Sequence, residues 1–554
     1  MSLLAPAAYP ENAPQQNFGA VFTRRWVVDL ILDLSGYTAD VDLTQLTAVE
    51  PSVGDGAFLS AMADRLLTAR ATHAPDATWA SLAGCIRAWD LQESHVKTCR
   101  ELASASLRAA GCPAEIANSL ATSWVRAGDF LLDTPDEEAA DFVLGNPPYI
   151  RIEDLAPDLL AAYRRACPTM GGRADVYIGF LERSLDLLKP GGRLGFICAD
   201  RWMRNQYGKR LRQKIAKQGF ALDYALTMHE VSAFAVEVSA YPAITVLRHG
   251  PQRTAILGNA AEAFGPAEAT RFQTWALTDS TVELLEPSVT GARLPHWQST
   301  ADSWPDGSPH LLAWLDELNE RFHPLESSDS HTRISIGVAT GADAVYVTKN
   351  AEAAEPERML PLAMAADIAS GTFIWGGNYL VNPWEQNGLV SLADWPELRR
   401  YLTQNSAAVR GRAIAKKNER TWHRTIDRVT LPLTKQPMLL LQDMKARIHP
   451  VLAPAGFYPH HNLYYIVSET WDLEVLGGLL LSEAVERQVA AYCVKMRGGT
   501  LRFQAQYLRR VRVPQQEEIH EVVQEELRLA FRSRDRDRAN TAALLAYGLE
   551  SLPD

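Results

Sequence analysis

An apolar run at residues 141–145 leads into Asn146, Pro147, Pro148 and Tyr149. Two consecutive prolines fix φ near −65° and remove two backbone donors, so the turn is stiff and its carbonyl groups are left to accept hydrogen bonds. The Asn146 side-chain oxygen and the Pro147 carbonyl can each accept a hydrogen from one –NH2 group, while the Tyr149 ring offers a face to the attached heterocycle. Such acceptors return a delocalised lone pair to the nitrogen. The turn therefore predicts a site that activates a planar amine, although it could also simply close a strand.

An activated amine needs an electrophile, and a glycine turn upstream indicates where one could bind. The apolar residues 46–49 are followed by Glu50, a turn at 51–56 and an apolar stretch at 57–62. Strand, glycine turn and helix in this order bring backbone close to a ligand, here at Gly54 and Gly56. Glu50 or Asp55 would suit a cationic amino group. This arrangement predicts a site for S-adenosylmethionine.

Two further acidic residues follow predicted strands. Residues 85–89 lead to Asp90, whose carboxylate could take both hydroxyls of a ribose, and residues 124–128 lead to Asp129. Asp129 could receive an adenine amino group while Phe130 packs against the ring. Each acid could instead cap the N-terminus of the next helix. Their succession at three strand ends, followed by the proline turn at the fourth, favours a binding site.

In this order the motifs resemble those of the γ-class amino DNA methyltransferases, the TaqI-type enzymes of restriction-modification systems. Residues 17–28 resemble motif X, in which Thr23 would contact the methionine carboxylate of the cofactor. Residues 50–59 resemble motif I, and Asp90, Asp129 with Phe130, and residues 146–149 resemble motifs II, III and IV. The resemblance assigns the following residues to S-adenosylmethionine: Thr23, Glu50, Ser52, Gly54, Asp55, Asp90, Asp129, Phe130, Asn146 and Phe180.

Two aromatic residues further along also follow the family pattern. Residues 175–182 resemble motif V, which would place Phe180 on the cofactor adenine. Phe234 falls where the family has an aromatic residue that stacks on an extruded base, opposite Tyr149. Tyr241 is close enough in sequence to compete for this role. The resemblance thus implies that Asn146, Pro147, Pro148, Tyr149 and Phe234 form the catalytic site.

Length and composition are those of an intracellular protein with several domains. At 554 residues the chain exceeds the roughly 250–300 at which single cores stop growing. The N-terminus lacks the pattern of an export signal, and no apolar run could cross a membrane, so we expect a cytoplasmic protein. The six cysteines form no close pair, and His449, His460 and His461 lack partners at ligand spacing. The sequence therefore indicates no metal site.

A net charge of −11 is unusual for a protein that binds nucleic acid, but the charge is unevenly distributed. Residues 399–447 carry twelve Lys or Arg against three acids, a formal charge of +9, and residues 495–512 hold a second basic stretch. Both contain aromatic residues and could instead be solvated faces. We expect these residues to contact DNA: Arg151, Arg173, Arg412, Lys416, Lys417, Arg420, Arg424, Lys445, Arg447, Arg497 and Arg502.

The fold predicted is α/β: a doubly wound, Rossmann-like class I methyltransferase domain followed by a mixed α/β target-recognition domain. The expected boundaries are 1–250 for the catalytic domain, 251–330 for an irregular connection, 331–515 for target recognition and 516–554 for a C-terminal helical segment. Residues 517–549 are expected to form one amphipathic helix, with the charged run 532–538 on a solvated face.

The sequence thus predicts a site-specific DNA methyltransferase that moves a methyl group from S-adenosylmethionine to N6 of an adenine flipped out of duplex DNA. A separately encoded restriction endonuclease or defence partner is possible. Two alternatives remain open. The first is an amino methyltransferase that acts on RNA or on a protein glutamine, and the second is a non-catalytic DNA-binding defence subunit.

Overall fold

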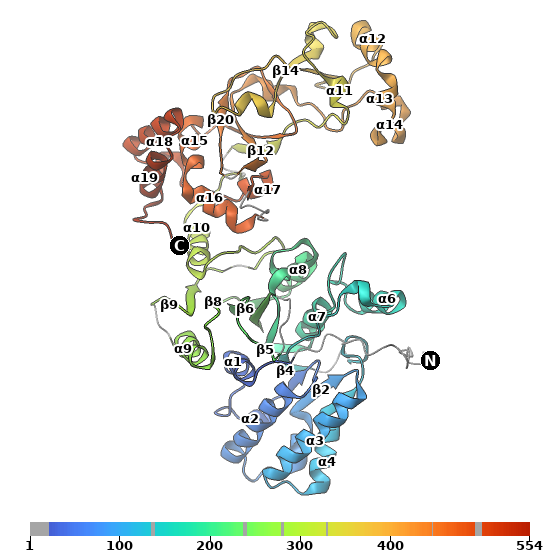
Figure 1. Cartoon of the computed structure of the whole chain (residues 1–554), viewed down its shortest axis with the longest axis vertical. Coiled ribbons are helices and arrows are strands. Elements are labelled where there is room, and N and C mark those ends of the chain that lie inside the picture. The colour runs from blue at the N-terminus through green and yellow to red at the C-terminus, as the bar shows by residue number, and fades with distance from the viewer. Residues whose placement is uncertain are drawn as a thin grey trace. The chain divides into compact units, whose positions relative to one another are not determined.

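The computed structural model describes residues 22–134, 139–235, 241–278, 282–297, 299–327, 331–445, 447–493 and 501–553, with the backbone alone at 444–445 and 501–502. Its chain forms two compact units, Met1–Asp316 and Glu317–Asp554 (Figure 1). None of the described helices is long and apolar enough to cross a membrane.

The first unit is built on a ten-stranded sheet with the order β3-β2-β1-β4-β5-β7-β6-β8-β10-β9. Strands β3, β2, β1, β4 and β5 run parallel, and β7 lies antiparallel between β5 and β6. The strands are β1 (Ala48–Glu50), β2 (Ile86–Asp90), β3 (Val125–Ala127), β4 (Ala140–Gly145), β5 (Leu188–Ala199), β6 (Phe220–Thr227), β7 (Pro242–His249), β8 (Ala255–Ala260), β9 (Leu284–Glu286) and β10 (Val289–Leu294).

Helices connect the parallel strands, as right-handed β-α-β crossovers require. On α2 the residues Leu59, Met62 and Leu66 recur at helical spacing and are fully buried, so this helix packs into the core. The helices of the unit are α1 (Arg25–Ser35), α2 (Ala57–His73), α3 (Glu93–Ala109), α4 (Ala114–Trp124), α5 (Phe130–Asp133), α6 (Pro157–Ala166), α7 (Tyr177–Leu187), α8 (Lys209–Lys217) and α9 (Pro266–Leu277). The doubly wound class I arrangement is confirmed.

The strand order reverses between β1 and β4, and in an open parallel sheet ligands bind at this switch point, beyond the carboxyl ends of the strands. The register places these ends together: Ala48 of β1 pairs with both Ile86 of β2 and Phe142 of β4. Glu50, Asp90 and the turn after Gly145 therefore meet at one edge of the sheet.

The second unit contains two four-stranded sheets, of order β12-β22-β18-β20 and β13-β15-β14-β21. Their strands are β12 (Thr332–Ile336), β13 (Val347–Thr348), β14 (Met359–Ala363), β15 (Tyr379–Val381), β18 (Met438–Gln442), β20 (Val451–Ala453), β21 (Tyr458–Pro459) and β22 (Leu463–Ser468). Three two-stranded pairs add β11 (His323–Pro324) with β24 (Arg512–Val513), β16 (Trp384–Glu385) with β17 (Gly388–Leu389), and β19 (Met444–Lys445) with β23 (Leu501–Arg502). This mixed α/β composition agrees with the predicted fold class.

Helices of the second unit are short in its middle and longer near its C-terminus. They are α11 (Asp343–Tyr346), α12 (Pro396–Gln404), α13 (Ser406–Arg410), α14 (Ala413–Lys417), α15 (Leu473–Leu481), α16 (Glu483–Tyr492), α17 (Ala505–Leu508), α18 (Glu521–Ser533) and α19 (Arg536–Tyr547), while α10 (Pro309–Arg321) spans the boundary between the units.

The segment expected as an irregular connection, 251–330, differs from the prediction. Its first part adds β8, β9 and β10 to the sheet and forms the helix α9, and the boundary between the units falls at 316, inside the expected connection. Prolines fall at the ends of these elements or between them: Pro266 is the first residue of α9, and Pro287 lies in the β9–β10 turn. Proline at an element boundary does not exclude a folded segment.

The C-terminal region forms two helices rather than the single helix expected from 517 to 549. Arg534 adopts a left-handed conformation with φ of 60° and ends α18, and the Asp535 side chain then accepts from the Arg538 backbone N–H to cap α19. The charged run is not simply a solvated face either. Arg532 pairs with Glu474, and the Arg534 guanidinium donates to the carbonyl groups of Pro450 and Gly371.

Candidate active site and nucleic-acid interface

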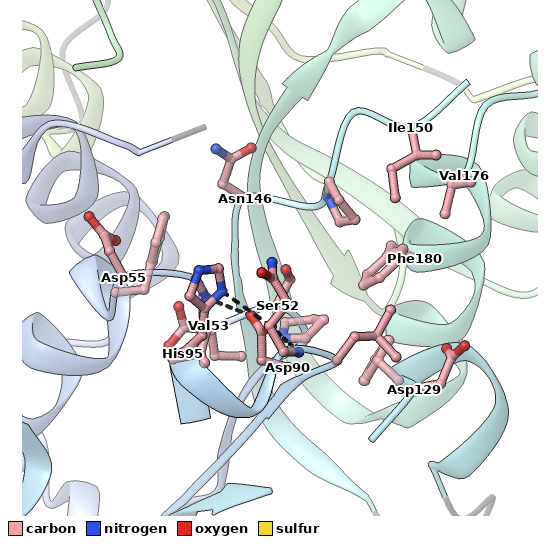
Figure 2. A pocket seen from close by; sticks show the side chains of 18 of the residues that line it. Ser52, Val53, Asp55, Asp90, His95, Asp129, Asn146, Ile150, Val176 and Phe180 are labelled. Carbon is pink, nitrogen blue, oxygen red and sulfur yellow. Dashed lines mark hydrogen bonds and ion pairs between the residues drawn. The ribbon is translucent and has the colours of Figure 1, made fainter. Parts of the chain in front are cut away.

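A pocket of about 900 Å³, open solvent at its mouth included, lies at the switch point of the sheet. The residues expected to bind the cofactor all line it: Thr23, Glu50, Ser52, Gly54, Asp55, Asp90, Asp129, Phe130, Asn146 and Phe180. Figure 2 shows Asn146 at one end of this cavity, with Asp55 and Asp129 on opposite sides of it. The structure therefore brings together residues that are up to 157 positions apart in the sequence.

Glu50 ends β1 and is 1% exposed. Burial raises the pKa of this carboxyl well above its ordinary value, and the charges of Asp55 and Asp90 raise it further. Its Oε2 atom has no hydrogen-bond partner among the described residues. A buried acceptor in a group of acids suits a bound cation, since a positive charge would offset both the burial and the repulsion.

Asp90 ends β2 and is held by the turn opposite. Its Oδ2 accepts from the Gly54 backbone N–H at 2.9 Å, and its Oδ1 accepts from the Gln92 N–H, also at 2.9 Å. Gly54 has φ of +53°, a conformation that favours glycine, and a Cβ there would meet no atom within 4 Å. The backbone at Gly54 therefore faces open space in which a ligand could approach the turn closely.

Asp129 takes one of the two roles considered for it, that of a helix cap. It caps α5, because its Oδ1 accepts from the Leu131 N–H at 2.9 Å, and its Oδ2 accepts from the Tyr163 hydroxyl at 2.7 Å. Burial raises the pKa of the carboxyl although both hydrogen bonds act against this. The neighbouring Phe130 ring stacks on Phe180 with centroids 5.5 Å apart and planes 21° apart. These two rings form an aromatic wall on the side of the pocket where adenine was expected.

The proline turn at residues 146–149, which is the predicted catalytic turn, contacts the segment before α1. The Asn146 Nδ2 group donates to the Thr23 hydroxyl at 3.2 Å. Thr23 in turn forms an isolated antiparallel bridge with Phe234. Because Nδ2 points at Thr23, the amide oxygen of Asn146 is directed elsewhere, as an acceptor for a substrate amine must be. Asn146, Thr23 and Phe234 thus form one group, although no spacing in the sequence connects them.

Phe234, rather than Tyr241, lies beside the catalytic turn. The Tyr149 and Phe234 rings pack edge to face, with centroids 6.3 Å apart and an interplanar angle of 79°. Tyr241 is 47% exposed and contacts the His229 ring instead, with the Arg201 guanidinium over its own ring at 4.1 Å. Since Tyr149 and Phe234 touch one another, a flat group can enter between them only if the rings move apart.

Several residues that line the pocket were missed by the sequence analysis. They include Leu91, Gln92, His95, Ile150 and Tyr163. Leu91 lines the pocket and is 42% exposed. His95 lies with Nδ1 3.3 Å from Asp90 Oδ1 (Figure 2). The position of Leu91 directly after a strand-end acid could have suggested it, whereas nothing in the sequence indicated His95.

The basic stretch of the second unit divides into internal and exposed residues. Lys416, Lys417 and Arg420 are exposed, as contact with phosphates requires. Arg412, in contrast, donates to the backbone carbonyl groups of Val409, Thr340 and Trp422. A guanidinium used in this way holds three segments together, so its predicted role in DNA contact is not supported by the geometry.

The other residues predicted to contact DNA have mixed positions. Arg151, Arg173 and Arg447 are exposed, and the Arg424 guanidinium lies over the Trp384 ring at 5.6 Å. Arg497 lies outside the described residues, as do the side chains of Lys445 and Arg502. The exposed arginines remain candidates for phosphate contact.

His460 and His461 have a partner that sequence spacing did not suggest. Asp343, at the start of α11, lies with its Oδ2 3.1 Å from His460 Nε2, and the His461 ring is tilted against the His460 ring with centroids 4.1 Å apart. The carboxylate and imidazole thus form a hydrogen-bonded pair that joins α11 to the segment after β21. The possible ligand atoms of Asp343, His460 and His461 lie within 4.8 Å of one another, so the fold brings together three metal-ligating side chains that the sequence did not group.

Comparison with known proteins gives a consistent result. The family model described as "Eco57I restriction-modification methylase" matches residues 115–221, which include Asp129, the catalytic turn and Phe180. The type IIG restriction endonuclease BpuSI is similar in structure, with a TM-score of 0.40 and 13% identity over 96% of this chain and 66% of that chain.

Two curated relatives match almost the whole chain. The type II methyltransferase M.XhoI of Xanthomonas vasicola is 40% identical over 96% of this chain and 97% of its own length. The type II methyltransferase M.PaeR7I of Pseudomonas aeruginosa is 42% identical over 96% of this chain and 92% of its own length. At this identity and coverage the chain belongs to the family of type II restriction-modification methyltransferases.

Proposed function

We propose that the protein is a site-specific DNA methyltransferase that transfers a methyl group from S-adenosylmethionine to the N6 amine of an adenine in double-stranded DNA. The observation that carries this proposal is the position of Asn146. It projects from the stiff proline turn into a pocket of cofactor size, and its amide is oriented by Thr23. The proposal is also supported by membership of the type II methyltransferase family.

The side chains along the pocket suit each part of S-adenosylmethionine. Glu50 and Asp55 would hold the amino group of its methionine part, and Asp90 would accept hydrogen bonds from the ribose hydroxyls. The aromatic wall of Phe130 and Phe180 would enclose the adenine ring. The Asp129 carboxylate would accept a hydrogen bond from the amino group of that adenine. When bound, the cofactor supplies an electrophilic methyl group on a sulfonium.

The catalytic turn would orient and activate the amine. The Asn146 side-chain oxygen and the Pro147 carbonyl would each accept one of its hydrogens, which localises the lone pair on nitrogen for in-line attack on the methyl group. Burial raises the pKa of Tyr149 well above its ordinary value, so this side chain stays a neutral aromatic surface rather than a base. Most of the rate enhancement would come from positioning and hydrogen bonding.

The base would reach this turn by leaving the duplex, because an N6 amine paired within DNA cannot approach Asn146. Tyr149 and Phe234 would separate from their edge-to-face contact and stack on its two faces. The exposed basic residues of the second unit, Lys416, Lys417 and Arg420, would contact phosphates while neighbouring loops read the sequence. A separately encoded restriction endonuclease would then cut DNA that lacks the methyl group.

Expression in a methylation-deficient bacterial host, followed by single-molecule sequencing of its genome, tests this proposal. We expect N6-methyladenine confined to one short motif, and no such mark with the Asn146→Ala variant. Modified cytosine would assign the pocket to a different amine. A methylated RNA or protein beside unmodified DNA would change the substrate class, and a complete absence of transfer in host and in vitro would contradict enzymatic function.

A further inference from the structure

The second unit holds a cluster of side chains that neither the cofactor pocket nor the basic stretch uses. It consists of Asp343, at the start of α11, with His460 and His461, which lie between β21 and β22. One possible ligand atom from each of these residues lies within 4.8 Å of those from the other two. Carboxylate oxygen and imidazole nitrogen are common ligands of transition-metal ions. Sequence spacing indicated no metal site, because Asp343 and His460 are 117 positions apart.

The distance between the first two ligand atoms suits a bound ion. Asp343 Oδ2 lies 3.1 Å from His460 Nε2. Two ligand atoms that each lie about 2.0–2.2 Å from one Zn²⁺ are roughly 2.8–3.6 Å apart at coordination angles between about 90° and 110°. The ion would therefore take the place of the proton that these two atoms share. A rotation of the His461 side chain would bring in the third ligand, since its Nδ1 has no hydrogen-bond partner among the described residues.

The backbone holds both histidines in place. The backbone N–H groups of His460 and His461 each donate to a carbonyl group, that of His461 to Val338, and Val338 also forms an isolated parallel bridge with His460. Gly337 packs against the same turn. A Cβ at this position would come within 2.3 Å of the carbonyl oxygens of Pro459 and His460, so a larger residue would displace the turn. The two imidazoles are therefore kept near Asp343 by close backbone packing.

The carboxylate of Asp343 is oriented by a neighbouring hydroxyl, as metal-ligating carboxylates commonly are. The Thr340 hydroxyl donates to Asp343 Oδ1 at 2.5 Å, which leaves Oδ2 directed at His460. The Asp343 side chain is 45% exposed, whereas that of His460 is only 2% exposed. An ion arriving from solvent would thus meet the carboxylate first and the buried imidazole behind it.

We propose that Asp343, His460 and His461 bind a divalent transition-metal ion of the zinc class. Two imidazole nitrogens disfavour Mg²⁺ and Ca²⁺, which are bound mainly by oxygen. Three protein ligands leave at least one coordination position for water. The ion would tie α11 to the turn between β21 and β22, two segments that the hydrogen bond between Asp343 and His460 already joins.

Titration of metal-free, full-length protein with Zn²⁺ by calorimetry, and with Co²⁺ by visible absorption, tests the site. We expect one ion per chain and no thiolate charge-transfer band, because the ligands are nitrogen and oxygen atoms. Asp343→Asn keeps the size of the side chain, and His461→Phe keeps an aromatic ring. Each should weaken binding by at least about 10-fold, since loss of an outer-shell partner alone costs about 10- to 100-fold. His331→Phe, at a histidine 4.0 Å from the Glu469 carboxylate and outside the cluster, is the matched control and should leave the affinity unchanged.

Thermal unfolding without metal shows which variants fold, and either of the two cluster variants is sufficient if the other does not. Zn²⁺ should raise the unfolding temperature of the wild type and of His331→Phe more than that of the cluster variants. These measurements need neither DNA nor cofactor, so failure of the proposed function would not affect them. Absence of binding to the wild type would overturn the proposal and leave Asp343 and His460 as a hydrogen-bonded pair. Equal affinity in the wild type and the cluster variants, or a thiolate band with Co²⁺, would also overturn it, because the ion would then be bound elsewhere.

Discussion

Thr23→Val is the most informative single change at the catalytic turn, because it removes the hydroxyl that accepts from Asn146 Nδ2 at 3.2 Å and keeps the side-chain volume. Loss of one neutral hydrogen bond costs about 1 kcal/mol, so we expect the methyl transfer rate to fall roughly fivefold. Asn146→Ala removes a group that acts on the reacting amine and should lower the rate by about 10²-fold or more. Thr23→Ser keeps a hydroxyl and should restore most of the activity.

Single-turnover transfer of a labelled methyl group to a cognate duplex, at saturating cofactor, measures these rates. If Thr23 acts through Asn146, adding Thr23→Val to Asn146→Ala should lower the rate no further. Calorimetric cofactor affinity separates this effect from the predicted contact between Thr23 and the methionine carboxylate. A wild-type rate for Thr23→Val, or an undiminished fivefold effect on the Asn146→Ala background, would refute the reasoning.

Three other expectations follow from the same structure. Burial and the charges of Asp55 and Asp90 raise the pKa of Glu50, so this carboxyl must lose a proton when it binds a cationic amino group. The affinity for S-adenosylmethionine, measured by calorimetry, should therefore rise with pH by up to about tenfold per pH unit below that raised pKa. This pH dependence should flatten in Glu50→Gln. Lys416→Ala should reduce the slope of log K against log salt by about one, and an unchanged slope would remove this residue from the DNA interface. A 2-aminopurine at the target adenine should brighten on binding, and Phe234→Ala should weaken that state by about 1–3 kcal/mol; if the matched Tyr241→Ala weakens it instead, the assignment of Phe234 is wrong.

The parts of the site that follow strand ends could be predicted from the sequence. Glu50, Asp90 and Asn146 each come directly after a short apolar run, and parallel strands place their carboxyl ends at one edge. This local pattern, together with the family resemblance, was enough to name residues that the structure finds in one pocket. Strand direction and the switch point both follow from the topology of the sheet, so residues at these strand ends meet in space.

Contacts between distant segments could not be predicted in the same way. The hydrogen bond between Asn146 and Thr23 joins residues 123 positions apart, and the bridge from Thr23 to Phe234 is longer still. The spacing of residues in the sequence does not predict such pairs, because they depend on how the segment before α1 crosses the folded sheet.

Charge composition predicted a basic region for DNA contact but could not assign a role to each of its residues. Arg412 and Lys416 are four positions apart in the sequence. Arg412 nevertheless donates to backbone carbonyl groups inside the unit, whereas Lys416 is exposed. A guanidinium has five donors in a rigid fork, and its hydration is weaker than that of an ammonium, so arginine is the basic residue best suited to such internal positions. Within a basic stretch, exposed lysines are therefore the better first candidates for phosphate contact, while each arginine must be judged by its own hydrogen bonds.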